Sequence, residues 1–294
     1  MNALKEYAAR VEKALKAKVE GMEGVPPLLQ EAMAYSLMAG GKRLRPVMLL
    51  AAVDMLGGDS GDAMDPACAV EMIHTSSLIH DDLPGMDDDV LRRGRPTNHV
   101  VYGEGQAILA GDGLLNWAGE ILARDALAHP GQLENRVRAM EEILRGAGPQ
   151  GMMGGQCLDL SCQQENRGGE KELMEIQLGK TCRMFIHPLR AAGWLAGAGE
   201  AEREALGRYG EAFGRMFQTA DDLLDVEGSQ AELGKSVGKD AQEGKLTAVA
   251  VYGLEGARKM VRDQMELALA ALEGFGQQGA FFRELVLSMK GRKS

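Results

Sequence analysis

Apolar side chains recur at intervals of three and four residues over several long stretches of the chain. The stretches are 67–83, 108–126, 173–185, 206–224 and 260–272. Such spacing places the side chains on one face of an α-helix. Leucine is also more common than valine, isoleucine and threonine together, whereas sheet proteins are rich in β-branched residues. Because glycine and proline clusters separate the stretches, we expect an all-α fold of about ten helices with no convincing strand.

The length and charge narrow the class of protein further. The chain has 294 residues without a long polar linker, so we expect a single domain over 1–294, a helical bundle around a central active-site cavity. A net charge of −10 argues against binding to nucleic acid or anionic membranes, which requires a basic surplus. No segment approaches the roughly 18–20 apolar residues that insert stably in a membrane. A charged N-terminus and four cysteines without a CxxC pair predict a cytoplasmic protein with free thiols.

An acidic cluster of five aspartates occupies residues 81–89. Pro84 and Gly85 end the preceding helix, so Asp81 and Asp82 fall in its last turn, where the helix dipole opposes negative charge. The mutual repulsion of these carboxylates is relieved either by full solvation or by hard cations such as Mg²⁺. Taken alone, a solvated acidic loop is the simpler interpretation.

A second acidic cluster, at residues 221–225, favours a metal site over a solvated loop. The tripeptide Asp-Asp-Leu recurs at 221–223, and Asp221 and Asp225 lie four residues apart on one helix face, with Asp222 adjacent. Two acidic patches, each at the end of an apolar helix, are able to hold several Mg²⁺ ions. Because Mg²⁺ often shares protein carboxylates with substrate phosphates, we expect a ligand that brings its own negative oxygens.

Basic residues suited to such a ligand lie beside glycines or near the acidic clusters. Each has a simpler explanation by itself: a solvated turn, local charge compensation, a surface lysine or a buried polar histidine. Together they form a candidate anion site. They are Lys42, Arg45, His74, Arg92, Arg93, Lys180, Lys235 and Lys245.

The motifs follow one another in a definite order along nearly the whole chain. They are Gly-Gly-Lys-Arg-Leu-Arg-Pro (40–46), Ser-Leu-Ile-His-Asp-Asp-Leu-Pro-x-Met-Asp (77–87), Arg-Arg-Gly-x-Pro-Thr (92–97), Ala-Gly-Asp (110–112), Gly-Gly-Gln-x-x-Asp-Leu (154–160), Gly-Lys-Thr (179–181), Phe-Gln-x-x-Asp-Asp-Leu-Leu-Asp (217–225) and Gly-Lys-Asp-x-x-x-x-Lys-x-Thr (238–247). The ordered set resembles the trans-isoprenyl diphosphate synthases, the polyprenyl synthetase family, and most closely its bacterial farnesyl and geranylgeranyl diphosphate synthases.

The resemblance implies a role for each matching residue. The carboxylates would surround about three Mg²⁺ ions on an allylic diphosphate, with Asp81, Asp87 and Asp221 the strongest candidates for ligands. Thr181 and Gln218 would present oxygens to the allylic cation. The full implied set comprises Asp81, Asp82, Asp87, Asp221, Asp222 and Asp225 for the metal; Arg92, Lys180 and Lys235 for the allylic diphosphate, with Lys245 adding charge; and Lys42, Arg45, His74 and Arg93 for isopentenyl diphosphate.

The implied reaction is head-to-tail condensation of isopentenyl diphosphate with an allylic diphosphate, performed by a homodimer. One departure from the family pattern is Ala248-Val249, where Tyr-Pro is common. Two other classes stay open: a class I terpene cyclase, and a non-catalytic subunit of a heteromeric prenyl synthase. A cyclase would carry a different second metal motif, and a non-catalytic subunit would be expected to lack one aspartate motif.

Product length is expected to depend on the side chains beneath the first aspartate motif. In farnesyl-producing relatives an aromatic residue often stands five positions before that motif, whereas this chain has Ser76 followed by Ser77. Neither can close a hydrocarbon channel, which favours geranylgeranyl diphosphate. Trp117 on a neighbouring helix could supply a floor instead, so farnesyl diphosphate stays an open alternative.

Overall fold

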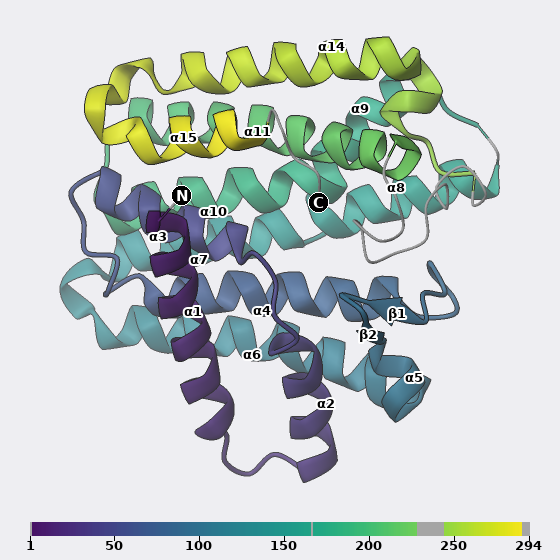
Figure 1. Cartoon of the computed structure of the whole chain (residues 1–294). Coiled ribbons are helices and arrows are strands. Elements are labelled where there is room, and N and C mark those ends of the chain that lie inside the picture. The colour runs from purple at the N-terminus through teal and green to yellow at the C-terminus, as the bar shows by residue number, and fades with distance from the viewer. Residues whose placement is uncertain (1, 166, 228–243, 290–294) are drawn as a thin grey trace. The chain divides into compact units, whose positions relative to one another are not determined.

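The computed structural model describes residues 2–165, 167–227 and 244–289. Within these ranges every regular element except one short hairpin is helical, so the all-α prediction is confirmed (Figure 1). The chain forms two compact units, residues 1–140 and 141–294. No helix in the described part is both long and apolar enough to cross a membrane.

The first unit is built around two long helices that lie side by side, α4 (Met64–Asp81) and α6 (Glu104–Ala128) (Figure 1). Most positions of α4 are buried, which is the pattern of a helix surrounded by neighbours. The remaining elements are α1 (Asn2–Glu20), α2 (Pro27–Leu37), α3 (Leu44–Met55), β1 (Leu91–Arg92), β2 (Arg95–Pro96), α5 (Asn98–Tyr102), a 3₁₀ turn (Pro130–Gln132) and the start of α7 (Leu133–Ala147).

The Ala-Gly-Asp motif is explained by the contact between α4 and α6. A Cβ atom on Gly111 of α6 would lie 2.1 Å from Nε2 of His80, so only glycine fits there. The ring of His80 lies against α6, with Nε2 3.3 Å from the carbonyl oxygen of Ile108. This contact fixes the last turn of α4, where the first aspartate motif begins.

The strands β1 and β2 form a hairpin that the sequence did not predict. Leu91 pairs with Pro96 and Arg92 with Arg95, in antiparallel register. The two-residue loop at 93–94 has φ angles of 53° and 73°, and positive φ at both central positions is what a tight type I′ hairpin requires. Strands of two residues are too short to show alternating hydrophobicity, which is why the sequence pattern indicated only a break.

The second unit is organised around α11 (Glu200–Glu227), which packs against α10 (Arg183–Leu195) and α14 (Ala248–Ala271) (Figure 1). Aromatic rings fill its centre: Phe185 and Phe213 have centroids 5.1 Å apart, and Tyr209 lies edge-on to Phe282 at 5.1 Å. The other elements are the end of α7, α8 (Met152–Gln164), α9 (Glu170–Ile176), a π-helical segment (Gln177–Cys182), a 3₁₀ segment (Glu273–Gly279) and α15 (Ala280–Ser288).

Glycines on α11 let the preceding helical segments approach its backbone. A Cβ atom on Gly210 would lie 2.8 Å from Cα of Ile186, and one on Gly214 would lie 2.8 Å from Cα of Cys182. The π-helical segment is therefore held directly against α11. Single π turns are frequent at functional sites, and this one carries Lys180 and Thr181.

Candidate functional site

The first aspartate motif begins at the C-terminal end of α4. The backbone N–H of Asp87 donates to the carbonyl oxygen of Asp81 at 2.9 Å, so the intervening loop folds back and brings these two residues together. Both are half-buried, whereas Asp82 is buried. The motif thus brings the backbones of Asp81 and Asp87 together, with both side chains half-buried and Asp82 buried.

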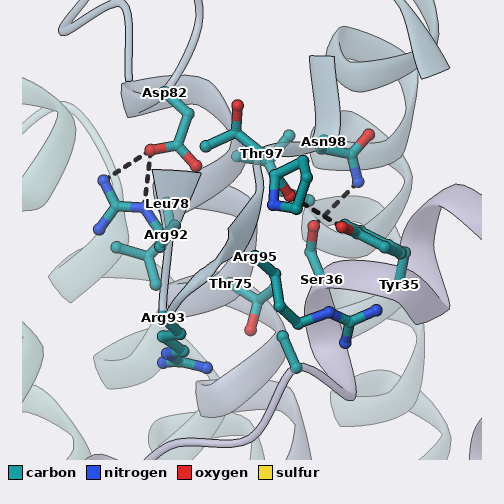
Figure 2. A pocket seen from close by; sticks show the side chains of 13 residues that line it. Tyr35, Ser36, Thr75, Leu78, Asp82, Arg92, Arg93, Arg95, Thr97 and Asn98 are labelled. Carbon is teal, nitrogen blue, oxygen red and sulfur yellow. Dashed lines mark hydrogen bonds and ion pairs between the residues drawn. The ribbon is translucent and has the colours of Figure 1, made fainter. Parts of the chain in front are cut away.

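The Asp82 carboxylate is bound by an arginine of the hairpin. Nε and Nη2 of Arg92 both lie 2.6 Å from Oδ1 of Asp82 (Figure 2). Burial raises the pKa of Asp82 to about 6, against the opposing effect of Arg92. Burial lowers the pKa of Arg92, but the charge and hydrogen bond of Asp82, together with the charges of Asp81 and Asp89, outweigh burial and leave that pKa above its ordinary value. Asp82 therefore holds Arg92 beside the motif.

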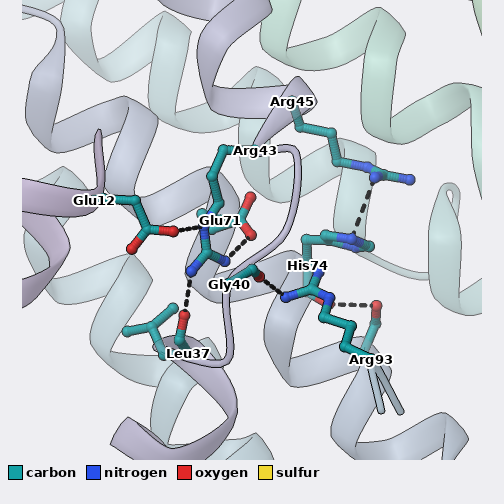
Figure 3. A network of polar contacts seen from close by, with 9 residues as sticks. Glu12, Leu37, Gly40, Arg43, Arg45, Glu71, His74 and Arg93 are labelled. Atoms are coloured by element: carbon teal, nitrogen blue, oxygen red, sulfur yellow. Dashed lines mark hydrogen bonds and ion pairs between the residues drawn. The ribbon is translucent and has the colours of Figure 1, made fainter. Parts of the chain in front are cut away.

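A second arginine, Arg43, is fully committed to the protein. It is buried, and its guanidinium donates to Glu12 at 2.7 Å, to Glu71 at 2.5 Å and to the carbonyl oxygen of Leu37 at 2.6 Å (Figure 3). Two carboxylates thus neutralise Arg43. We infer that it supports the 40–46 loop without being a ligand group itself.

The neighbouring Arg45 differs from Arg43 because its hydrogen-bond partner is His74, which is not a carboxylate. Nη1 of Arg45 lies 3.2 Å from Nε2 of His74 (Figure 3), and because a guanidinium only donates, this histidine nitrogen is the acceptor. Burial and the Arg45 charge hold the pKa of His74 well below its usual value. Burial, with a further contribution from Arg93, lowers the pKa of Arg45 to about 10.

Arg93 is the third member of the group that contains Arg45 and His74. Its guanidinium donates to the carbonyl oxygen of Gly40 (Figure 3), and a Cβ atom on Gly41 would lie 2.8 Å from that guanidinium. Burial and the nearby arginines lower the pKa of Arg93. Cations that depress one another's pKa are stabilised by an anion, so Arg45 and Arg93, with the neutral His74 beside them, form a site suited to a phosphate group. Lys42 is exposed in the same loop.

In the second unit, a chain of hydrogen bonds leads from the π-helical segment to the second aspartate motif. Oγ1 of Thr181 donates to Oε1 of Gln218 at 2.7 Å, and Nε2 of Gln218 donates to Oδ1 of Asp222 at 2.9 Å. The other oxygen of Asp222 accepts the backbone N–H of Ala248 at 2.8 Å. The buried Asp222 carboxylate therefore binds the first turn of α14 and orients Gln218.

The two outer aspartates of this motif differ from each other in exposure. Asp221 is half-buried, like Asp81 and Asp87, whereas Asp225 is buried. In each motif a half-buried aspartate, Asp81 or Asp221, is followed directly by a buried one, Asp82 or Asp222, that is hydrogen-bonded by the protein.

Lys180 is held by a residue that the sequence analysis did not assign. Nζ of Lys180 lies 2.6 Å from Oδ2 of the buried Asp159. The approach depends on Gly155, where a Cβ atom would lie 2.0 Å from the backbone nitrogen of Lys180. The Gly-Gly-Gln-x-x-Asp-Leu motif pointed to these positions, because it contains both, but their role follows only from the contact.

The other predicted residues are distributed as follows. Ser76 is buried in α4, Ser77 donates its hydroxyl to the carbonyl oxygen of His74 at 2.9 Å, and Trp117 is half-buried in α6. Lys245 is half-buried just before α14. Lys235 lies outside the described residues.

The carboxylates suit Mg²⁺ by their chemistry. Asp81 and Asp87 are brought together by a backbone hydrogen bond, and hard carboxylate oxygens are the ligands that Mg²⁺ prefers. Among the described residues no group of three or more metal-ligating side chains converges on one point. A pair of carboxylates is sufficient where substrate phosphates supply the other ligands, as is usual for Mg²⁺.

Comparison with known proteins agrees with these motifs. The polyprenyl synthetase family model matches residues 26–278. A farnesyl diphosphate synthase of Geobacillus stearothermophilus is 42% identical over 281 residues, covering 94% of this chain and 92% of that protein. A chloroplastic geranylgeranyl pyrophosphate synthase of Arabidopsis thaliana is 47% identical over 255 residues, covering 85% of this chain and 70% of that protein.

A solved structure agrees in fold as well. The crystal structure of an FPP/GFPP synthase from Zymomonas mobilis superposes with a TM-score of 0.86 at 31% identity, covering 98% of this chain and 99% of that one. The motifs, the helical fold and these similarities lead to one conclusion: the chain belongs to the polyprenyl synthetase family.

Proposed function

We propose that this protein is a short-chain trans-prenyltransferase that condenses isopentenyl diphosphate with allylic diphosphates. The observation that carries the proposal is the pair of cations Arg45 and Arg93 with the neutral His74 beside them, in the same unit as the first aspartate motif. An anion site and a carboxylate pair suited to Mg²⁺ together fit two diphosphates that bind differently. The family membership and the printed names of the relatives support the same reaction.

In the first unit, Arg45, His74, Arg93 and Lys42 bind the diphosphate of isopentenyl diphosphate without metal. Arg92 binds the allylic diphosphate, and Asp81 and Asp87 would hold Mg²⁺. When bound, Mg²⁺ would supply Lewis-acid stabilisation of the departing diphosphate. Asp82 keeps Arg92 in place, which its short contacts with the guanidinium support.

In the second unit, Asp221 contributes to the metal site, and Lys180, oriented by Asp159, binds the allylic diphosphate. Lys235 and Lys245 add positive charge. The Thr181 hydroxyl and the Gln218 amide orient each other, and their oxygens stabilise the allylic carbon as positive charge develops there. Asp222 and Asp225, being buried, act on the metal site indirectly. We propose that both units serve this one reaction as a single catalytic domain.

We propose geranylgeranyl diphosphate as the main product, with farnesyl diphosphate as the shorter alternative. Ser76 and Ser77 are both too small to block a growing chain, and Trp117 is the large side chain on the neighbouring helix. We further propose that the enzyme is a cytoplasmic homodimer that requires about three Mg²⁺ ions per site, as the resemblance implies.

The test is an incubation of the purified chain with labelled isopentenyl diphosphate, each allylic diphosphate in turn, and Mg²⁺. Chromatography of the dephosphorylated products should reveal twenty-carbon or fifteen-carbon alcohols. Release of pyrophosphate from an allylic diphosphate without isopentenyl diphosphate would point to a cyclase. A purified chain that forms no product with any primer would indicate a non-catalytic subunit.

A further inference from the structure

The hairpin at 91–96 carries two arginines, Arg92 and Arg93, that the proposed function assigns to different diphosphates. Within the described part of the chain, this sheet has only two strands. A two-stranded hairpin is marginally stable by itself in water, so contacts with neighbouring helices must decide where it lies. The position of both arginines therefore depends on those contacts.

Packing beneath the hairpin is incomplete. A small cavity is lined by Tyr35 of α2, Leu78 of α4 and Arg95 of the hairpin, among others (Figure 2). Atoms that border a void lack partners on that side and lose the corresponding dispersion contacts. Two buried polar atoms of the lining, Oγ1 of Thr75 and Oδ1 of Asn98, have no hydrogen-bond partner among the described residues. Apolar packing alone therefore holds the hairpin weakly.

Tyr35 supplies the specific attachment on the side of α2. Its hydroxyl donates to the carbonyl oxygen of Pro96 at 2.8 Å, and the guanidinium of Arg95 lies 4.4 Å from the centre of its ring (Figure 2). The ring is itself braced edge-on by Tyr102 of α5, with centroids 5.6 Å apart. Tyr35 thus contacts both residues of β2 through two different interactions.

The register of the hairpin makes this attachment necessary. Arg92 and Arg95 are directly opposite each other, and like charges at such positions destabilise an antiparallel pair. Arg92 has Asp82 as its partner, at the end of α4. Arg95 has the face of the Tyr35 ring, on α2. Each cation therefore has its own partner on a different helix.

The chain that follows the hairpin is attached to the same helix. Nδ2 of Asn98 donates to the carbonyl oxygen of Ala32 at 2.8 Å and to the hydroxyl of Ser36 at 2.9 Å. Since both attachments lead to α2, that helix is the support of the hairpin.

We propose that Tyr35 and Arg95 are positioning residues, which clamp the hairpin to α2 and so hold Arg92 and Arg93 ready for the two diphosphates. This inference rests on the proposed function of those arginines. Loss of the clamp lets the hairpin shift and weakens binding of both substrates. The KM values for isopentenyl diphosphate and the allylic diphosphate should then rise together, with a smaller change in kcat.

The test compares graded variants of the full-length enzyme. Tyr35→Phe removes only the hydrogen bond to Pro96 and should raise both KM values roughly two- to fivefold. Tyr35→Leu also removes the cation–π contact and should raise them roughly tenfold. Arg95→Met in the Tyr35→Leu background should add little, because both changes remove the same contact.

The matched control is Trp194→Leu in the second unit. It removes another cation–π contact, in which the Arg203 guanidinium lies 3.8 Å from the Trp194 ring centre, but neither residue touches the proposed site. It should leave both KM values unchanged. Unchanged KM values in folded Tyr35→Leu, or an equal rise in Trp194→Leu, would overturn the clamp.

Hydrogen exchange separates this inference from the proposed function, because it needs no turnover. Backbone amides in 91–97 should exchange faster in Tyr35→Leu than in the wild-type protein, while those of α11 are unaffected. If the wild-type protein has no synthase activity, the proposed function is refuted. Hydrogen exchange in 91–97 then still tests whether Tyr35 and Arg95 clamp the hairpin to α2. Unchanged exchange in 91–97 would refute the clamp even in an active enzyme.

Discussion

Aspartates with the same sequence pattern have different environments in this protein. In each motif an accessible carboxylate, Asp81 or Asp221, is followed by a buried one, Asp82 or Asp222, whose oxygens are hydrogen-bonded by protein groups. A carboxylate that already accepts two hydrogen bonds has less capacity for a metal ion. Adjacent aspartates are therefore expected to respond differently to substitution.

Replacing Asp221 or Asp81 by Ala should lower kcat by roughly a hundredfold or more, because charge stabilisation at the leaving diphosphate is lost. Replacing Asp222 by Ala should also lower the free energy of unfolding by about 1–3 kcal/mol, since the N–H of Ala248 loses its buried acceptor. Urea unfolding and steady-state assays of all three variants provide the measurement. Equal destabilisation by Asp221→Ala and Asp222→Ala would contradict this division of roles.

His74 predicts a dependence of stability on pH. Its pKa in the folded protein is well below the usual 6.5, because of burial and neighbouring arginines, so the unfolded chain binds more protons below about pH 6.5. The contribution of neutral His74 is fully present above that pH and is lost as the pH falls. The free energy of unfolding should fall by at most about 1.4 kcal/mol for each pH unit below that point. Denaturant unfolding between pH 7.5 and 5 should show a smaller decline for His74→Gln than for the wild-type protein.

At the scale of helices, glycine positions decide how closely α11 and the π-helical segment approach. Gly214 and Gly207 both lie on the buried side of α11, but their surroundings differ. A Cβ on Gly214 would lie 2.8 Å from Cα of Cys182, whereas one on Gly207 would meet only the side chain of Arg190, at 3.5 Å. The first contact is too short for any side chain, and the second is ordinary van der Waals contact.

Gly214→Ala should therefore destabilise the protein by about 1–3 kcal/mol through overpacking. It should also reduce turnover, because the displaced helix moves Thr181 away from Gln218. Gly207→Ala serves as the control and should be neutral or stabilising by up to about 1 kcal/mol, the usual helix preference for alanine. Thermal unfolding and kcat of both variants test this difference. If Gly214→Ala leaves the free energy of unfolding unchanged, the close packing of α11 against the π-helical segment does not require glycine at this position.

The residues proposed to set product length, Ser76 and Trp117, lie on α4 and α6. Replacing Ser76 by Phe should shorten the main product by one or two five-carbon units, because a large ring closes the space beneath Asp81. Trp117→Ala should lengthen it if this ring is the present floor. Chromatography of the dephosphorylated products distinguishes the two variants. An unchanged product from folded Ser76→Phe would place the floor elsewhere.

For the whole molecule, the acidic net charge of −10 has a consequence for ligand binding. The aspartate motifs repel inorganic pyrophosphate that carries no metal, which leaves it only the proposed metal-free site at Arg45 and Arg93. Mg²⁺ alone lacks the phosphate ligands that complete its shell. The two together should stabilise the protein by about 2.7 kcal/mol at one hundred times the dissociation constant. This cooperation is measured by thermal unfolding with pyrophosphate alone, with Mg²⁺ alone and with both together. Full stabilisation by pyrophosphate with EDTA would exclude a role for metal.

The sequence alone determined the fold class and supplied the motifs from which the candidate site is proposed. Periodic apolar spacing depends only on the geometry of the helix, so 67–83 and 206–224 correctly indicated α4 and α11. The charged motifs were recognisable because clusters of like charge are costly without a ligand. A two-residue strand and a π turn leave no such periodic signal.

Only the tertiary structure showed which side chains contact each other, and so which role we propose for each. Asp82 and Asp222 look equivalent to their neighbours in sequence, yet burial and contacts with Arg92 and with the start of α14 separate them. The roles of Asp159 and Tyr35 follow from contacts with residues 21 and 61 positions away. Local spacing carries no information about such distant contacts, because they form only when several helices pack together.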